Sequence, residues 1–211
     1  MADIDQVVEI TSLAELRAML PAPVDRSVKK EYRYLHPHHR AFIAESPFVA
    51  LATAGADGTC DVSPKGDPAG FVRVLDDTTL VVPDRPGNRR VDGFANVLAN
   101  PHVGLLFLIP GREDTLRVNG QARLLRDAPF FDDLVVRGHR PTLALLVEVE
   151  QVFFHCAKAF KRSALWRPET WGDPARLPSV AQVAKDTMDI PQTLAELERY
   201  YGPEYDRQLY G

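Results

Sequence analysis

Hydrophobic and polar residues alternate along the middle of the chain with a period of two, which predicts β-strands. Residues 47–53 and 59–63 are two such runs on either side of an Ala-Asp-Gly turn, and residues 70–75 and 79–83 are joined by a second short turn. A short turn containing glycine or aspartate places consecutive strands side by side in opposite directions. Each pair therefore predicts an antiparallel hairpin.

Three longer runs complete the strand pattern. Residues 102–109 are almost continuously apolar, so we expect a strand that is covered on both faces. Residues 114–125 alternate regularly, and residues 143–156 alternate with Glu148 and Glu150 on one face. About seven strands with mostly short connections predict a closed antiparallel barrel and disfavour a parallel α/β sheet.

Helical periodicity lies on both sides of the strands and once between them. Ser12 and Glu15 form a capping-box pattern that opens a short helix, and Pro37 suits the first turn of another. Further helical patterns cover residues 89–100, 179–187 and 191–201. The fold class is therefore mainly β (α+β). We expect an N-terminal helical extension (1–46), a barrel (47–166) and a C-terminal helical arm of the same domain (167–211).

Composition narrows the function classes. The 211 residues are 45% hydrophobic and 26% charged, and the formal net charge is −4. A negative balance gives no support to a nucleic-acid binder, because neutralising phosphates requires a basic face. No apolar run is long enough to span a membrane, and the acidic N-terminus does not resemble a secretory signal, so we expect a cytoplasmic protein.

One turn has unusual chemistry for an acidic chain. The sequence DRPGNRR, residues 84–90, contains three arginines and a glycine between a strand pattern and a helix pattern. A phosphate group is bound by backbone N–H groups of a tight turn, positive charge and a helix N-terminus, and this turn offers all three. Gly87 lets the backbone come close to a bound phosphate, and Asn88 is suited to cap the following helix. Arg89 can donate two hydrogen bonds to phosphate oxygens. An ordinary charged surface loop is the alternative.

Three other segments carry cations or polar groups that a shared anionic ligand would use. Ser63 and Lys65 stand before the strand that carries Arg73, and Arg117 lies in mid-strand, where it requires either a carboxylate or an anionic ligand. Lys158, Lys161 and Arg162 fall on one face of a predicted helical turn. Taken singly, each is also compatible with an ordinary turn, an internal ion pair or a solvated helix.

Other catalytic patterns are disfavoured. His36, His38 and His39 lack the spacing of a metal site, and we interpret them as a surface cluster. Cys156 follows His155 directly, and adjacent strand residues point to opposite faces, so they do not form a thiolate–imidazole pair. The sequence contains no dinucleotide-binding, Walker or nucleophile-elbow motif.

The order of strands, the turn PDRPGNRR, a helix, NPHVGLLF and RVNGQARLL resembles the pyridoxamine 5′-phosphate oxidase-like flavoproteins from about Pro47 to Trp166. That resemblance implies an antiparallel split β-barrel with flanking helices. It also implies a homodimer with FMN at the subunit interface. The chain departs from the oxidase itself at Pro83 and Asp84 and in its ending, YDRQLYG, so the substrate stays unassigned.

The resemblance also implies roles for individual residues. The strand end and turn would hold the FMN phosphate and the flavin edge, Thr115 and Arg117 would approach the ring or ribityl chain from the partner subunit, and the basic segment after the last strand would add cations. The complete predicted cofactor-binding set is Ser63, Lys65, Arg73, Val82, Pro83, Asp84, Arg85, Asn88, Arg89, Thr115, Arg117, Lys158, Lys161 and Arg162.

The predicted function is an FMN-dependent oxidoreductase that transfers hydride or electrons between a nicotinamide or small-molecule donor and an unassigned acceptor. Because the flavin performs the redox chemistry, no catalytic acid–base pair is required. The alternatives are a flavin carrier or sensor without turnover, a protein that binds the deazaflavin F420 or haem in the same type of barrel, and a structural barrel without a cofactor.

Overall fold

The computed structural model describes residues 6–210, apart from the side chains of residues 26, 27, 203 and 204. Residues 1–5 and 211, at the outer ends of the predicted extension and arm, lie outside the described residues. The chain divides into two compact units, Met1–Glu31 and Tyr32–Gly211. The first unit contains α1 (Leu13–Met19) and α2 (Asp25–Val28), and Ser12 caps α1 as its sequence predicts.

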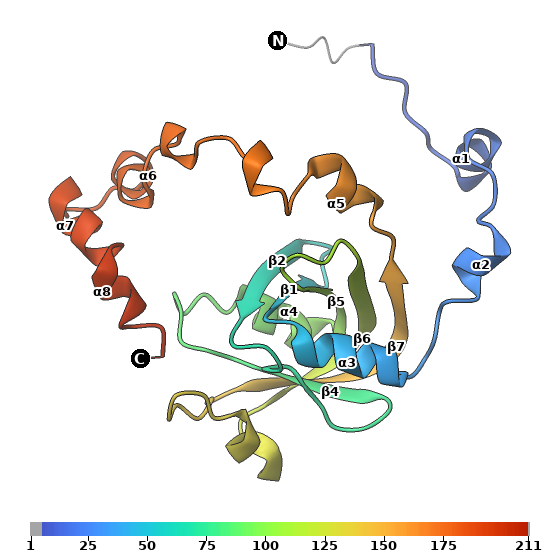
Figure 1. The fold of residues 1–211 in the computed structure, drawn as a ribbon, viewed down its shortest axis with the longest axis horizontal. Helices are drawn as coiled ribbons and strands as arrows, with labels where there is room; N and C mark the ends of the chain where they lie inside the picture. The colour runs from blue at the N-terminus through green and yellow to red at the C-terminus, as the bar shows by residue number, and fades with distance from the viewer. Residues whose placement is uncertain (1–5, 211) are drawn as a thin grey trace. The chain divides into compact units, whose positions relative to one another are not determined.

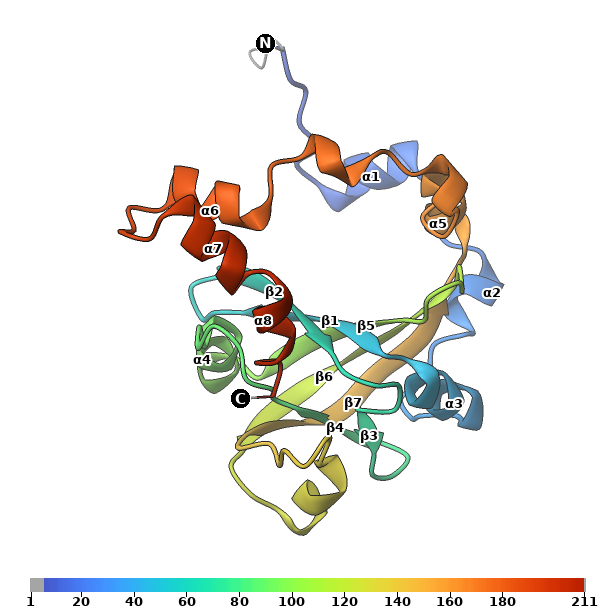
Figure 2. The same ribbon diagram turned by 60° about the vertical axis from the view of Figure 1, so that its left-hand side comes forward.

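The second unit is built around one sheet (Figures 1 and 2). Its strands are β1 (Phe48–Ala54), β2 (Cys60–Gly66), β3 (Arg73–Val74), β4 (Thr79–Pro83), β5 (His102–Leu108), β6 (Thr115–Leu125) and β7 (Ala144–His155). The seven strands follow the order β2-β1-β5-β6-β7-β4-β3, and each neighbouring pair is antiparallel. Both predicted hairpins form, and the predicted antiparallel barrel class is confirmed.

The second unit also contains helices. They are α3 (Pro37–Glu45), α4 (Asp92–Ala99), α5 (Lys158–Ser163), α6 (Val180–Thr187), α7 (Leu194–Tyr200) and α8 (Pro203–Asp206), with 3₁₀ turns η1 (Pro129–Leu134), η2 (Pro168–Thr170) and η3 (Pro174–Arg176). Helix α3 contacts β3 and β6, whereas α4 contacts β1, β2 and β6. Helices α6 and α7 bury Ala181, Ala184 and Leu197 in a small core of their own. Within the described residues, no helix combines the length and the apolar character needed to cross a membrane.

The main core lies between the sheet and α3 and α4. Phe107 and Leu116 are fully buried in it, and Leu35, Phe42 and Ile43 join them from the segment before β1. Because these residues pack into the barrel, the compact unit begins at Tyr32 and includes α3, whereas the predicted extension runs to residue 46.

Three local predictions were wrong in detail. The predicted strand 70–75 is reduced to Arg73–Val74, because Gly70 has a φ of +82° and Phe71 and Val72 fold into the core outside the ladder. The helix predicted from residue 89 begins at Asp92, because Arg89 has a φ of +60°, which no α-helical residue adopts. Strand β5 alternates between buried and half-buried positions after the exposed His102, so one of its faces is only partly covered by the described residues.

A β-bulge shapes the long β6–β7 ladder. The register shifts between Asn119, which pairs with Gln151, and Gly120, which pairs with Val149, so Glu150 is skipped in the residue pairing of the two strands. A Cβ atom at Gly120 would lie 2.0 Å from the carbonyl oxygen of Glu148. Only glycine fits there, and the bulge places Arg117, Asn119, Gln151 and Phe153 on one face of the sheet.

Candidate functional site

The polar residues of β2 face α4. Lys65 donates to the Asp84 carboxylate at 2.9 Å, and its ammonium lies 4.9 Å from the centre of the Phe94 ring. Both members of this ion pair are about three-quarters buried, with exposed fractions of 22% and 24%. Ser63 lies two residues before Lys65 on the same face of β2, beside Gly93 of α4. The structure therefore brings together Ser63, Lys65 and Asp84 from the predicted set.

A second ion pair lies beside the first along the chain. Arg85 donates from Nε to Asp67 at 2.5 Å and from Nη2 to the carbonyl oxygen of Leu134 at 2.9 Å. The Asp67 side chain is 1% exposed and that of Arg85 is 13% exposed. The Nη1 atom of Arg85 is buried without a hydrogen-bond partner. Arg85 is thus a brace between the loop after β2 and η1, and the sequence did not identify Asp67 as its partner.

The rest of the arginine turn is exposed. Asn88 accepts a hydrogen bond from the Arg90 backbone N–H at 3.0 Å, and Arg90 pairs with Asp92 at 2.8 Å. Arg89 differs from its two neighbours in the turn, because none of the described carboxylates forms an ion pair with it. Helix α4 begins three residues after Arg89, and among the described side chains none forms a cap hydrogen bond at its N-cap residue, Val91.

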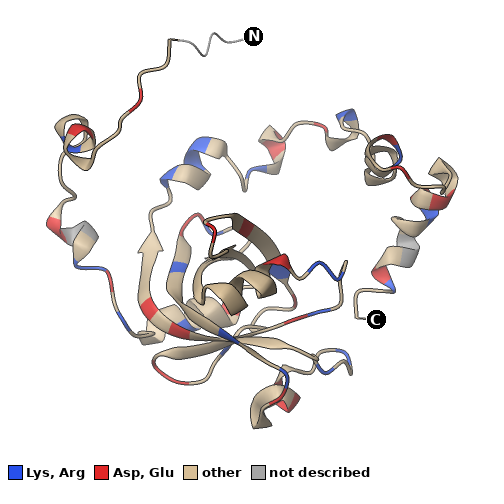
Figure 3. Ribbon diagram, turned by 180° about the vertical axis from the view of Figure 1, so that it is seen from behind, with Lys and Arg blue, Asp and Glu red and all other residues tan. Residues whose placement is uncertain are grey.

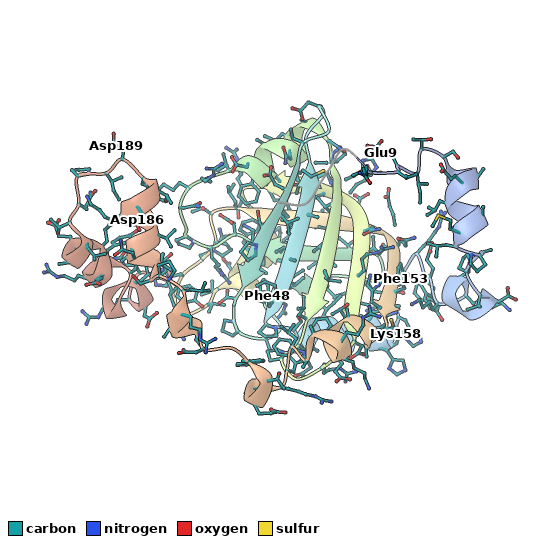
Figure 4. All side chains as sticks on the ribbon, turned by 90° about the horizontal axis from the view of Figure 1, so that it is seen from above. Glu9, Phe48, Phe153, Lys158, Asp186 and Asp189 are labelled. Carbon is teal, nitrogen blue, oxygen red and sulfur yellow. The ribbon has the colours of Figure 1, made fainter. Side chains whose placement is uncertain are left out.

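The opposite face of the sheet carries a separate polar cluster. The Arg117 guanidinium lies 4.2 Å from the centre of the Phe153 ring, and its Nη2 donates to Gln151 at 2.9 Å. Asn119 donates to the same Gln151 oxygen at 2.9 Å. The Nε atom of Arg117 is buried without a partner. Phe153 is labelled in Figure 4 together with Phe48, and two strands, β5 and β6, lie between their strands in the sheet.

The register places these two groups on different faces. Lys65 pairs with Val49, which pairs with Phe107, and both hydrophobic residues are buried in the core. Arg117 pairs with Leu106, which pairs with Ala50, and these belong to the half-buried outer face. Because side chains alternate along a strand, one chain presents Lys65 and Arg117 on opposite sides of its sheet.

Other predicted residues lie apart from both groups. Arg73 pairs with Val81 and lines two shallow cavities of about 210 and 360 Å³, neither lined by another predicted residue. The side chains of Val82 and Pro83 are buried, and Thr115 is 4% exposed, so their surroundings are mainly protein.

The basic segment after β7 forms a helix, as predicted. Lys158, Lys161 and Arg162 are exposed on α5, and Lys161 lies 3.3 Å from Glu113. Trp166 ties the following turn to the barrel by donating to the carbonyl oxygen of Arg112 at 2.6 Å. Figure 3 shows cationic residues on α5 and in the loop between β4 and α4.

The histidine cluster has a structural explanation. His36 caps α3 by accepting from the His38 N–H, and His39 accepts from the His36 N–H at 3.2 Å. Burial lowers the pKa of His39, and the neighbouring His36 lowers it further. Within the described residues, no group of His, Cys, Asp and Glu is arranged to hold a metal ion.

Sequence reasoning missed four residues that complete these clusters: Asp67, Asn119, Gln151 and Tyr210. Asn119 had a signal, because it stands two residues from Arg117 and alternation places both on one face. Gln151 follows only from the β6–β7 register. Tyr210 donates a hydrogen bond to Asp67 from 143 positions away, and no local pattern indicates that contact.

Solved structures of similar fold cover a little more than half of the chain. HupZ of Group A Streptococcus is 20% identical, with a TM-score of 0.46 over 56% of this chain and 92% of that one. An FMN-binding protein from Syntrophomonas wolfei is 13% identical, with a TM-score of 0.44 over 56% and 83%. HutZ, the heme storage protein from Vibrio cholerae, is 19% identical, with a TM-score of 0.42 over 56% and 93%. The chain has no significant match among curated proteins.

The family model described as pyridoxamine 5′-phosphate oxidase matches residues 35–156, more than half of the chain. The match begins at Leu35, where the chain enters the barrel core, and ends directly after β7, so it spans the whole sheet. It overlaps the region in which the sequence motifs resemble the family, about Pro47 to Trp166, over residues 47–156. The chain belongs to the pyridoxamine 5′-phosphate oxidase-like family, the relatives of the FMN-binding split barrels.

Proposed function

We propose that this protein binds FMN and acts as an FMN-dependent oxidoreductase. The proposal rests on one observation, namely that Arg89 is exposed and forms no ion pair with a described carboxylate. Its neighbours Arg85 and Arg90 are neutralised by Asp67 and Asp92, whereas Arg89 is exposed, pairs with no described carboxylate and precedes the uncapped N-terminus of α4. An unpaired guanidinium beside free helix N–H groups is suited to a dianionic phosphate ester.

We further propose that the site is shared by two copies of the chain. Lys65 and the arginine turn lie on one side of the sheet edge, and Arg117 lies on the opposite face. The outer face around Arg117 consists of small and apolar residues that a single chain leaves half-buried, including Ala50, Ala52 and Leu106. In the dimer that we propose, a partner covers this face and its arginine turn lies near Arg117 of the first chain.

The residues present have distinct tasks in such a site. FMN, when bound, supplies hydride or electron transfer. Arg89 and the α4 N-terminus hold the phosphate, and Arg85 braces the turn through Asp67 and the Leu134 carbonyl group. Arg117 provides a cation whose Nε still lacks a hydrogen-bond partner, held in place by Gln151 and Phe153. A fixed cation of this kind stabilises an anionic ring system.

Lys161 is a weaker candidate for the same electrostatic role. Its ammonium already lies 3.3 Å from the Glu113 carboxylate, and its side chain is 63% exposed, so water screens its charge. A binding protein without turnover, for FMN, F420 or haem, is the alternative function.

The first experiment is the visible absorbance spectrum of the purified protein, with mass analysis of the small molecules that heating releases. A two-banded flavin spectrum and released FMN support the proposal. A Soret band, released F420, or a colourless protein that takes up no added FMN contradicts it. For a flavin-loaded protein, reduction by NADH or NADPH followed by reoxidation separates an enzyme from a carrier.

Arg89→Ala tests the phosphate assignment. Loss of a charge-assisted hydrogen bond of about 1.5–3 kcal/mol should raise the dissociation constant of FMN roughly 10- to 100-fold. Riboflavin, which lacks the phosphate, should bind both proteins equally. Arg126→Ala removes the same charge from an exposed position outside the predicted set and should leave FMN affinity unchanged. Equal affinity of Arg89→Ala and wild type would refute the assignment.

A further inference from the structure

The C-terminal arm ends in a contact that the proposed cofactor site does not explain. The Tyr210 hydroxyl donates to Oδ1 of Asp67, while Oδ2 of the same carboxylate accepts from Arg85. Asp67 is almost completely buried, so Tyr210 reaches an enclosed charged group and not a surface carboxylate. Hydrogen bonds to charged groups are stronger than neutral ones, and burial strengthens them further.

The aromatic ring of Tyr210 makes separate contacts with a second loop. It stacks on His139 with 5.7 Å between ring centres, and the Arg137 guanidinium lies 5.4 Å from its centre. The His139 N–H donates to the Val136 carbonyl oxygen at 2.9 Å, and the Val136 N–H donates to the His139 carbonyl oxygen at 3.2 Å. These two bonds close the small turn that contains Arg137 and His139. Tyr210 is therefore held through its hydroxyl and its ring by groups from two different loops.

These contacts join the end of the chain to the ion pairs of the candidate site. Asp67 follows Lys65 by two residues, and Arg85 follows Asp84, the partner of Lys65. The Asp67 backbone N–H also donates to the carbonyl oxygen of Pro47 at 3.2 Å, which fixes the loop at the start of β1. A displacement of Tyr210 removes one of the two hydrogen bonds to the Asp67 carboxylate and thereby loosens the position of Arg85.

We propose that residues 205–210 form a strap that closes over the loop after β2 and the turn of residues 136–139, with Tyr210 as its anchor. The strap has two conformations. In the closed conformation it holds Arg85 and the arginine turn in place, and in the open conformation the turn is free to move. Its effect on ligand exchange rests on the proposed function, because the turn is the proposed phosphate site. The strap itself is testable without any ligand.

Limited trypsin proteolysis of the intact protein tests the strap. Cleavage after Arg207, followed by mass spectrometry, reports the open population when opening is fast relative to cleavage. Tyr210→Phe removes only the hydroxyl group and should raise the rate of cleavage about tenfold, the loss expected for one hydrogen bond to a charged group. Tyr205→Phe, a matched control, removes a hydroxyl group from the same segment and should leave the rate unchanged.

Two outcomes overturn the strap: wild-type cleavage rates in Tyr210→Phe, or equal acceleration in Tyr205→Phe, which would indicate general fraying. In a flavin-loaded protein, Tyr210→Phe should also release FMN several-fold faster after dilution, measured by the recovery of flavin fluorescence. Equal release rates refute the coupling to the turn. Failure of every variant and the wild type to bind FMN counts against the proposed function alone, because the cleavage experiment still decides the strap.

Discussion

Gly120 shows how a single residue determines the geometry of the sheet. An added Cβ atom would lie 2.0 Å from the Glu148 carbonyl oxygen and 3.3 Å from a Val147 methyl group, so the strands would have to separate. Because of the bulge, even-numbered residues of β7 up to Glu148 and odd-numbered residues from Gln151 onward point to the same face of the sheet. It is therefore Gly120 that allows Gln151 and Phe153 to share a face with Arg117.

Gly120→Ala should destabilise the protein by about 3 kcal/mol, because the contact is with backbone that has no freedom to rotate away. Gly66→Ala is the control: its Cβ atom would meet the Pro47 carbonyl oxygen at 3.5 Å, an ordinary contact. We expect its effect to stay within about 0.5 kcal/mol. Urea unfolding of both variants measures the difference, and equal stabilities would show that the ladder relaxes around the extra methyl group.

At the scale of elements, the β1–β5–β6 face is the most informative surface. The nearly continuous apolar sequence of residues 102–109 predicted a strand covered on both sides, yet Gly104, Leu106 and Leu108 are only half-buried in a single chain. The hydrophobic effect favours covering such a face. A partner in the proposed homodimer would cover this face, and the apolar sequence of the strand is what such an interface requires.

Ala52→Asp tests that explanation, because Ala52 pairs with Gly104 at the middle of this face. A charge buried there without a partner should shift the assembly from dimer to monomer in sedimentation velocity, with unchanged secondary structure by circular dichroism. Ala56→Asp, in the exposed β1–β2 turn, should remain a dimer. A wild-type monomer, or a dimeric Ala52→Asp variant, would contradict the proposed interface.

At the scale of the whole molecule, the closed strap depends on pH. The hydrogen bond to Asp67 raises the pKa of Tyr210, burial and the Asp67 charge raise it further, and Arg137 and Arg85 oppose this shift. His139 also faces the ring. A tyrosine whose pKa is raised by folding contributes stability that is complete below the unfolded pKa, about 10, and is lost as pH rises through the folded value.

We therefore expect the strap to be closed at neutral pH and to open above pH 10, roughly the ordinary tyrosine pKa. Hydrogen exchange of residues 205–210, corrected for the intrinsic rate at each pH, should lose protection in that range. Tyr210→Phe should be unprotected already at neutral pH, and its protection should show no such transition. A wild-type protein without a transition would exclude Tyr210 as the anchor.

The sequence by itself determined the elements that depend on neighbouring residues. Period-two alternation and short turns predicted both hairpins and the long strands, because the same local geometry that places side chains on alternate faces also requires the pattern. The cap of α1 was predicted for the same reason, since Ser12 and Glu15 lie within four positions of each other. The family motifs were also present in the sequence and agree with the matched region.

Only the tertiary structure decided which charged residues are neutralised within the chain. Asp67 and Asp92 pair with Arg85 and Arg90, and Asp84 pairs with Lys65. Among the described residues, this leaves Arg89 as the arginine of the turn without an ion pair. It also separated Lys65 from Arg117 by the thickness of the sheet and brought Tyr210 to Asp67 across 143 positions. Such pairings depend on strand register and on how segments distant in sequence pack against each other. Neither can be read from the spacing of residues along one segment.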